Sequence, residues 1–241
     1  MSSPTERRAL ITGASSGIGK ATALALADAG IHVALVSRSQ EQLEAVAHQA
    51  RQRGIEAKAF ALDLFKIEQV HAEIATLSEA FGPFDILINN AGMGYTQPLA
   101  NTPLADWQRV IDLNLTSVFE CIKGVLPGMR EKGGGTIVNI VSIGGKQVFP
   151  NWGAYCASKF GLMALSQALA AEERPHGIRV TAICPGSVNT SLWDTPTVDA
   201  DFDRGAMLHP ETVARSILHA VELPPEATLD ELILMPNIGT F

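Results

Sequence analysis

The chain has 241 residues, and its 18 basic and 25 acidic side chains leave a formal net charge of −7. Because 46% of the residues are hydrophobic and only 18% are charged, the composition excludes an intrinsically disordered chain. A net negative chain without a basic run is also unsuited to nucleic acid, whose phosphates require clustered Lys and Arg.

Short apolar runs alternate with longer helical patterns from one end of the chain to the other. The runs are nearly continuous, which is typical of parallel strands covered by helices on both faces. The alternation predicts an α/β fold, a single Rossmann-like domain over residues 1–241 with a doubly wound, seven-stranded parallel sheet. In chain order we expect strand 7–12, helix 18–29, strand 31–37, helix 40–53, strand 56–62, helix 67–81, strand 84–89, helix 104–131, strand 135–142, helix 153–174, strand 178–184, helix 210–222 and strand 231–235.

Two places depart from this regular pattern. Pro127 lies inside the expected helix 104–131 and should kink or end it. Residues 187–208 follow a strand with neither a short turn nor a clear helix, and loops of that length are usually functional lids or mobile segments. We therefore expect a mobile substrate loop there, with a harmless surface insertion as the alternative.

Gly-, Asn- and Ser-rich segments follow successive expected strands, which predicts a ligand site because open parallel sheets bind ligands beyond their carboxyl ends. After the first strand, Gly13 permits a tight turn, Gly17 lets a ligand approach the backbone, and Gly19 allows close packing. The following helix N-terminus favours a pyrophosphate. The segment therefore predicts dinucleotide binding, although its G-x3-G-x-G spacing differs from the commoner fingerprint and such a turn can be purely structural.

The residues after the second strand favour NADP(H) over NAD(H). An NAD site usually places an acidic residue here for the ribose 2′-hydroxyl, whereas NADP needs a cation for the 2′-phosphate. This chain has Ser37 and Arg38, and the nearest downstream acid is Glu41. Serine can donate to a phosphate and arginine can bind it bidentately. The alternative is that Arg38 is simply a solvated loop residue.

Tyr155 and Lys159 are four residues apart in an expected helix, so both can meet one ligand. An ammonium group, helped by a cationic nicotinamide ring, should lower the pKa of the tyrosine hydroxyl. Ser142, at the end of the preceding strand, faces the start of this helix. The combination predicts proton-transfer chemistry, although a Tyr–Lys pair alone could be an exposed surface pair.

The sequence offers no signal for metal, membrane or export. Cys121, Cys156 and Cys184 are scattered, and no His, Cys or Asp cluster has ligand spacing, so we expect reduced thiols and no metal. The first eight residues lack the apolar stretch of a secretory signal, and no apolar run could span a bilayer. We expect a cytoplasmic protein without membrane or nucleic-acid partners.

Taken together, these motifs resemble the short-chain dehydrogenase/reductase family in its single-domain form, over essentially the whole chain. The glycine turn, from Thr12 to Gly19, looks like the family's cofactor motif. Asn89-Asn90-Ala91-Gly92 looks like its NNAG motif, and residues 185–190 look like its PG-x-x-x-T segment. The family's catalytic positions are matched by Asn114, Ser142, Tyr155 and Lys159.

The resemblance implies a role for each catalytic residue. Tyr155 would protonate the carbonyl oxygen, or act as the base in the reverse direction, and Ser142 would stabilise charge on that oxygen. Lys159 would hold the nicotinamide ribose and lower the tyrosine pKa. Asn114 would position a water in a proton relay, although by itself it could be an ordinary polar residue in a long helix.

The resemblance also implies which residues form the binding sites. The cofactor contacts would be Thr12, Gly13, Ser15, Ser16, Gly17, Ile18, Gly19, Ser37, Arg38, Asp63, Leu64, Asn90, Ala91, Gly92, Tyr155, Lys159, Pro185, Gly186, Val188 and Thr190. The substrate pocket would be formed by Met93, Tyr95, Val148, Phe149, Trp152, Leu192, Trp193 and Met207. Such a pocket suits bulky or aryl ketones and aldehydes, unless several of these residues pack the loop or a subunit interface.

We therefore expect an NADPH-dependent reductase of small-molecule ketones or aldehydes, reversible as a secondary-alcohol dehydrogenase. One alternative is a 3-oxoacyl-carrier-protein reductase of fatty-acid synthesis, although Gly133 and His176 stand where arginines would face the acidic carrier. Another is a non-catalytic NADP-binding sensor or scaffold, which would be expected to lose the catalytic residues. The family's usual assembly and the apolar tail 232–235 predict a homo-oligomer, a tetramer or a dimer.

Overall fold

A parallel sheet runs through the computed structural model, which describes residues 6–201 and 203–237. Within these residues, seven strands stand in the order β3-β2-β1-β4-β5-β6-β7 and pair in parallel. The strands are β1 (Arg8–Thr12), β2 (His32–Ser37), β3 (Ala57–Ala61), β4 (Ile86–Asn89), β5 (Gly135–Ile140), β6 (Ile178–Pro185) and β7 (Glu231–Leu234). All seven predicted strands are confirmed. The strand order reverses between β1 and β4, which is where such sheets bind ligands.

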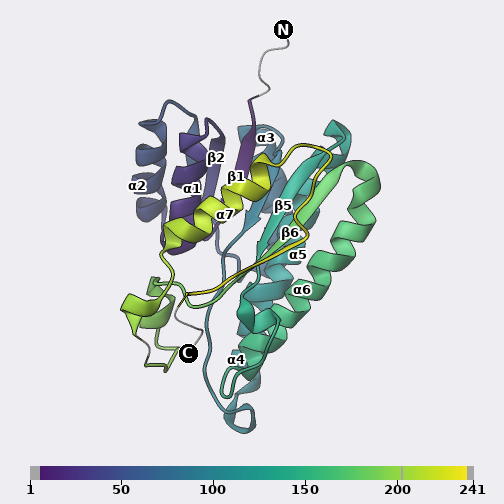
Figure 1. Ribbon diagram of the computed structural model, residues 1–241. Helices are drawn as coiled ribbons and strands as arrows, with labels where there is room; N and C mark the ends of the chain where they lie inside the picture. The colour runs from purple at the N-terminus through teal and green to yellow at the C-terminus, as the bar shows by residue number, and fades with distance from the viewer. Residues whose placement is uncertain (1–5, 202, 238–241) are drawn as a thin grey trace.

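Helices cover both faces of the sheet (Figure 1). One face carries α1 (Gly17–Asp28), α2 (Gln40–Arg51) and α7 (Pro210–Glu222). The other carries α3 (Ile67–Phe81), α5 (Ser117–Lys132) and α6 (Gly153–Glu173). A shorter helix, α4 (Leu104–Ile111), lies at the lower end of Figure 1. Of the helices that the structure describes, none combines the length and the apolar character needed to cross a membrane.

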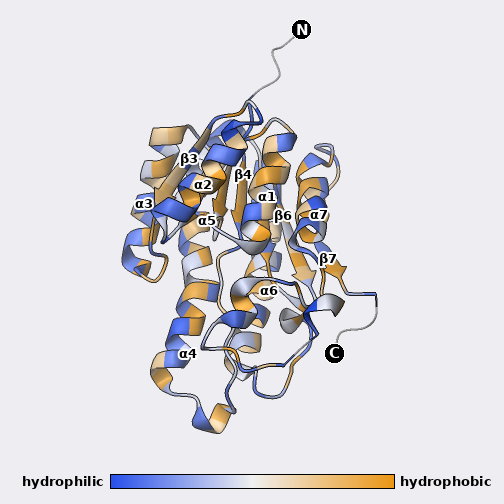
Figure 2. Cartoon of the chain, turned by 90° about the vertical axis from the view of Figure 1, so that its left-hand side faces the viewer, coloured by the Kyte–Doolittle hydropathy of each residue, from blue (hydrophilic) through white to orange (hydrophobic). Residues whose placement is uncertain are grey.

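The double coverage of the sheet accounts for its continuous apolar strands. Ile86 and Ile88 of β4 belong to the hydrophobic cluster beneath α1, α2 and α7, whereas Leu87 between them belongs to the opposite cluster. Successive side chains of a strand point to opposite faces, so a strand covered on both faces must be apolar at every position. Hydrophobic colouring of the inner strands is visible in Figure 2.

The predicted helix 104–131 is interrupted, but not at its proline. α4 widens into a π-helical turn at Asp112–Thr116 and then continues as α5, which includes Pro127 and ends at Lys132. Pro127 therefore does not end the helix. In the π-helical region the Ser117 hydroxyl donates to the carbonyl of Leu113 at 2.7 Å, which gives that backbone acceptor a partner.

The long segment 187–208 contains more local structure than the sequence indicates. Short 3₁₀ turns occupy Ser191–Asp194 and Arg204–Ala206. A parallel β-bridge pairs Val188 with Leu208, so the two ends of the loop lie side by side. The mobility that the sequence suggests for this loop stays a prediction.

Candidate active site

A cavity of about 1130 Å³ runs along the carboxyl edge of the sheet. Its lining comes from the segments that follow β1, β2, β3, β4, β5 and β6, which confirms that the unusual residues share one edge. Its volume exceeds that of a typical small-ligand pocket and suits an extended cofactor together with a substrate.

The glycine turn after β1 has the shape that an anion requires. Gly13 and Gly17 have φ values of +65° and +52°, a region that side-chain-bearing residues rarely adopt. Ser16 precedes α1 without capping it through its side chain, so first-turn N–H groups are left for another acceptor. These features fit a dinucleotide pyrophosphate, and Gly13, Ser15, Ser16, Gly17 and Ile18 all line the cavity.

Thr12 has a structural role, and its predicted contact with a cofactor stays a prediction. It is 2% exposed and absent from the cavity lining. Its hydroxyl accepts hydrogen bonds from the backbone N–H groups of Asn90 and Ala91, each at 3.0 Å. Asn90 Nδ2 in turn donates to the carbonyls of Thr12 and Gly13 at 3.0 and 3.1 Å. These four hydrogen bonds hold the turn after β1 against the segment after β4.

Gly19 also lies outside the cavity lining, and the close packing around its Cα explains why this position needs a glycine. A Cβ at this position would lie 2.3 Å from the Gly13 carbonyl oxygen and 2.5 Å from Asn90 Nδ2.

Gly19→Ala should therefore displace the turn, lower the unfolding free energy by about 1–3 kcal/mol and weaken cofactor binding. Denaturant titration measures the unfolding free energy, and fluorescence titration measures cofactor binding. Gly128→Ala on α5 is the control, because its Cβ would meet only Pro83 at 3.6 Å. Equal stability of Gly19→Ala and the wild type would contradict this account.

The residues predicted for the adenosine half of the cofactor all line one end of the cavity: Ser37, Arg38, Asp63 and Leu64. Arg38 is exposed, and its guanidinium carbon lies 6.0 Å from the centre of the Phe65 ring. Sequence reasoning missed Phe65 and Arg109, which line the same end and contact each other at 4.9 Å. Arg109 is one helical turn before Leu113, another lining residue, but the sequence did not single out Leu113 either and so gave no signal for Arg109.

Ser142 has a strained backbone beside the tyrosine. Its φ is +127°, a value that residues other than glycine seldom adopt and that is most common at functional sites. The Ser142 hydroxyl oxygen accepts from the Gly144 N–H at 3.0 Å and hydrogen-bonds with Tyr155. A Cβ on Gly144 would lie 2.9 Å from the Tyr155 ring, so glycine leaves room for the tyrosine. Sequence reasoning missed Gly144, which occurs in the unremarkable run Ile143-Gly144-Gly145.

Lys159 reaches the same place from the next turn of α6. It is 5% exposed, its Nζ donates to the Ile140 carbonyl at 2.9 Å, and it lies 5.8 Å from the centre of the Tyr155 ring. Ser142, Tyr155 and Lys159 all line the cavity. The structure thus brings together the three polar groups that the sequence singled out.

Burial dominates the titration of both groups on α6. Burial raises the pKa of Tyr155 to about 12, and the hydrogen bond with Ser142 offsets only part of this. Burial also lowers the pKa of Lys159 to about 8. Desolvation of the phenolate thus outweighs the favourable contacts of Tyr155, and the lowering of its pKa by Lys159 with a cationic nicotinamide ring stays a prediction.

Asn114 lies in the π-helical turn, is fully buried and is not part of the cavity lining. Its Oδ1 accepts from the Met93 N–H at 2.8 Å, and its Nδ2 donates to the Met93 carbonyl at 3.0 Å and to Ser158 Oγ at 3.1 Å. Ser158 donates to the Tyr155 carbonyl at 2.7 Å. Asn114 thereby connects the segment after β4 with the helix that carries Tyr155.

The predicted substrate residues divide into two groups. Met93, Phe149, Trp152, Leu192 and Trp193 line the cavity. Tyr95, Val148 and Met207 do not, so their contact with a substrate stays a prediction. Tyr95 is 6% exposed and donates to Asp106 Oδ2 at 3.0 Å, Val148 is 73% exposed, and Met207 is 6% exposed.

The nicotinamide half of the predicted cofactor site lies in the same cavity. Its predicted residues line the wall there: Asn90, Ala91, Gly92, Pro185, Gly186, Val188 and Thr190. Gly17 and Thr190 approach closely, since a Cβ on Gly17 would lie 3.0 Å from Thr190 Cγ2. Within residues 6–201 and 203–237 there is no group of three or more potential metal ligands.

A protein-family model described as short chain dehydrogenase matches residues 7–199. The chain belongs to the short-chain dehydrogenase/reductase family. Members of this family are oxidoreductases that act on alcohol and carbonyl groups, so the protein is an oxidoreductase of that class and uses a nicotinamide cofactor.

Two of the similar proteins match nearly the whole length of this chain. Glycine betaine reductase from Emericella nidulans is 38% identical over 95% of this chain, which spans only 18% of that much longer protein. An alcohol dehydrogenase from the archaeon Thermococcus sibiricus, solved with 5-hydroxy-NADP, is 30% identical with a TM-score of 0.89 over 97% of this chain and 98% of that one.

Two further solved structures show that family members bind either cofactor. A variant of actinorhodin polyketide ketoreductase, solved with NADPH, is 32% identical with a TM-score of 0.88 over 100% of both chains. Carveol dehydrogenase from Mycobacterium avium, solved with NAD, is 25% identical with a TM-score of 0.87 over 95% of this chain and 96% of that one. The choice of cofactor in this chain therefore depends on its own residues.

Proposed function

We propose that this oxidoreductase is an NADPH-dependent carbonyl reductase, reversible as a secondary-alcohol dehydrogenase. The observation that supports this most directly is the convergence of Ser142, Tyr155 and Lys159 in the cavity that also contains the glycine turn. A sensor or scaffold would have no need to keep a strained serine, a buried lysine and a tyrosine together in this arrangement.

Each polar group has a defined task in this proposal. When bound, the nicotinamide ring would supply or accept the hydride. Tyr155 donates its proton to the carbonyl oxygen in reduction, and Ser142 donates a hydrogen bond to the same oxygen as negative charge develops. Lys159, whose pKa lies at about 8, carries a proton at neutral pH and stabilises the phenolate left on Tyr155.

Asn114 acts on the reacting groups indirectly, through the residues that it binds. Its bonds to Met93 and Ser158 hold the cavity wall and α6 in register, so we assign it a positioning role. The proton relay through a water that the resemblance implies stays a prediction. The cofactor contacts proposed for Asp63, Leu64, Val188 and Thr190 are supported by their presence in the cavity lining.

The preference for NADPH follows from Arg38. Wild-type protein should bind NADPH more tightly than NADH, and Arg38→Gln should weaken NADPH binding about 10- to 100-fold, because a charged bidentate contact to the 2′-phosphate is lost. Binding of NADH should change little. Fluorescence titration with NADPH and NADH measures both affinities. Arg215→Gln, an exposed arginine of α7 outside the cavity lining, is the control.

Two results would contradict the cofactor assignment. One is a wild-type protein that binds NADH at least as tightly as NADPH. The other is an Arg38→Gln variant with the wild-type ratio of the two affinities, which would mean that Arg38 is a solvated loop residue after all.

The substrate end of the cavity favours bulky or aryl carbonyl compounds. Phe149, Trp152 and Trp193 supply aromatic surface beside Tyr155, with Trp152 at 5.3 Å from Tyr155 between ring centres. Aromatic rings also attract quaternary ammonium groups, and one relative is named glycine betaine reductase, so a trimethylammonium aldehyde belongs in a substrate panel with aryl ketones and a 3-oxoacyl thioester. NADPH oxidation across this panel tests the substrate class.

The carrier-protein alternative requires free cations near the ends of α5 and α6. Arg130 pairs with Glu173, Lys132 Nζ lies 2.7 Å from Asp85 Oδ1, and Arg174 lies 3.8 Å from Asp230. Because these cations already have carboxylate partners, they are less suited to an acidic carrier, which supports a free small-molecule substrate.

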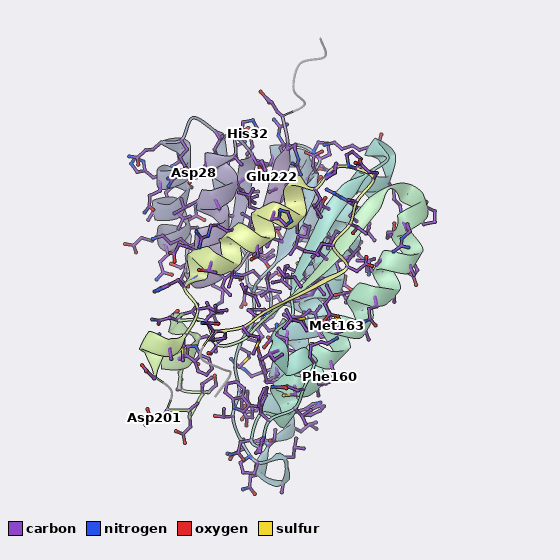
Figure 3. All side chains as sticks on the ribbon, in the orientation of Figure 1. Asp28, His32, Phe160, Met163, Asp201 and Glu222 are labelled. Atoms are coloured by element: carbon purple, nitrogen blue, oxygen red, sulfur yellow. The ribbon has the colours of Figure 1, made fainter. Side chains whose placement is uncertain are left out.

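A homo-oligomer and a cytoplasmic location stay predictions. Phe119 on α5 is 43% exposed and Phe160 on α6, labelled in Figure 3, is 42% exposed. Exposed aromatic side chains on neighbouring helices are typical of subunit interfaces, which supports a dimer or tetramer.

A further inference from the structure

Arg204 lies on the returning half of the loop between β6 and α7, the loop on which Asp201 is labelled in Figure 3. Its Nε donates to Asn189 Oδ1 at 2.9 Å, and its two terminal nitrogens donate to the Thr190 carbonyl at 2.8 Å and to Asp194 Oδ1 at 3.0 Å. Asn189 Nδ2 donates back to the Arg204 carbonyl at 3.4 Å. Four hydrogen bonds therefore join the returning half of the loop to its outgoing half.

These three acceptors require an arginine in particular. A guanidinium presents five N–H donors in one plane, so it can donate to a side-chain amide, a backbone carbonyl and a carboxylate at once. A lysine ammonium is a compact group on a flexible chain and cannot reproduce that spread of donors. The contact is thus a clamp specific to this side chain, and not a general attraction to Asp194.

The clamp acts on a stretch that forms a wall of the cavity, which we call the wall segment, residues 190–193. At the start of the wall segment, Thr190 lies against the glycine turn, because a Cβ on Gly17 would lie 3.0 Å from Thr190 Cγ2. Further on, Leu192 packs beside the segment after β4, because a Cβ on Gly94 would lie 3.0 Å from Leu192 Cδ2. The wall segment thus borders both the cofactor end and the substrate end.

Trp193, the last residue of the wall segment, is connected to Tyr155 through the ring of Trp152. The Trp193 ring packs edge-on to Trp152 at 5.9 Å, and Trp152 packs edge-on to Tyr155 at 5.3 Å. Trp193 Nε1 donates to the Val188 carbonyl at 2.8 Å, which fixes the orientation of the ring. A shift of the wall segment would therefore displace the aromatic rings around the reacting carbonyl.

We propose that Arg204, which does not itself line the cavity, is a positioning residue that holds the wall segment against the bound cofactor and substrate. The inference rests on the proposed function, since it assumes that a nicotinamide cofactor and a carbonyl substrate occupy this cavity. Arg204 acts through Thr190, Leu192 and Trp193, and the hydrogen bonds within the loop are its means of doing so.

The test compares Arg204→Gln and Arg204→Lys with wild type and with the control Arg215→Gln. In the protein without ligands, hydrogen exchange of the amides in 189–195 should be faster in Arg204→Gln and unchanged in Arg215→Gln. The dissociation constant for NADPH and the KM for the carbonyl should each rise about tenfold in Arg204→Gln, with a smaller effect on kcat. Arg204→Lys should recover only part of the loss, and methylguanidine added to Arg204→Ala should restore part of the NADPH affinity.

The outcomes separate this inference from the proposed function. Normal exchange, NADPH affinity and KM in Arg204→Gln would overturn the positioning role while leaving the proposed function intact. A fall in melting temperature with faster exchange throughout the chain would also overturn it, because Arg204 would then be a general stabilising residue. Failure of wild-type protein to bind NADPH would instead refute the proposed function, and the exchange comparison would still decide whether the clamp orders 189–195.

Discussion

Replacing Tyr155 by Phe should lower kcat for carbonyl reduction by about a thousandfold or more, because the reaction loses its proton donor. The change removes only the hydroxyl, so the ring stays against Trp152 and NADPH should still bind with near wild-type affinity. Stopped-flow or steady-state NADPH oxidation gives kcat, and fluorescence titration gives the cofactor affinity.

The chain provides a matched control, because its other tyrosine is Tyr95. Tyr95 also has a hydrogen-bonded hydroxyl, donated to Asp106, but lies outside the cavity lining. Tyr95→Phe should cost about 1 kcal/mol of stability and leave kcat close to wild type. Near-normal turnover by Tyr155→Phe, or equal losses in both variants, would rule out the proposed mechanism.

Replacing Lys159 by Met should abolish most activity and yet stabilise the protein at pH 7. Burial lowers the pKa of Lys159 from 10.5 to about 8, a difference of roughly 2.5 units that corresponds to about 3 kcal/mol. Loss of the hydrogen bond to the Ile140 carbonyl offsets about 1 kcal/mol, so the net gain should be about 2 kcal/mol. Denaturant unfolding at pH 7 measures this difference, and the trade of stability for function is common at active sites.

The pH dependence of wild-type stability should also reveal the cost of burying the Lys159 charge. Below pH 8 both folded and unfolded states hold the lysine proton, so the cost of burying the charge is fully present. Between about pH 8 and 9 the unfolded state binds the lysine proton and the folded state does not, so the unfolding free energy should rise with pH. Above about pH 9 the trend should reverse, because burial raises the pKa of Cys121 from 9.0 to about 12, of Cys184 from 9.0 to about 11 and of Tyr155 from 10.0 to about 12. The unfolded state releases these protons first, so the unfolding free energy falls with pH.

Lys159→Met should lack the rise between about pH 8 and 9, whereas Lys20→Met, on α1 outside the cavity lining, should keep it. Equal pH profiles for wild type and Lys159→Met, or a Lys159→Met variant less stable at pH 7, would contradict the assignment of a buried charge.

Local patterns were sufficient for the strands and for most of the site. Apolar runs such as His32–Val36 predict buried parallel strands, and the carboxyl ends of such strands meet at one edge, so local patterns alone place Gly13, Arg38 and Ser142 together. The break in helix 104–131 could not be located, because Pro127 is the obvious local signal whereas the π-helical turn at Asp112–Thr116 coincides with buried contacts of Asn114.

The predicted residues agree least with the cavity lining at the substrate end, for a physical reason. Tyr95, Val148 and Met207 lie near lining residues in the sequence, but side-chain direction in a loop has no fixed period, so proximity along the chain does not say which residues face the cavity. Arg109 and Phe65 were missed because they come from α4 and from the segment after β3, which meet only in the folded protein.

The sequence by itself determined the class of fold, the position of the ligand edge and the identity of the glycine turn and of Ser142, Tyr155 and Lys159. These depend on short-range rules of strand periodicity, backbone freedom and helical spacing. Only the tertiary structure decided that the Thr12 hydroxyl binds the segment after β4, that burial opposes ionisation of Tyr155, and that Arg204 hydrogen-bonds across the loop that carries the wall segment. Those properties arise from contacts between segments distant in the chain, and desolvation exists only once they have come together.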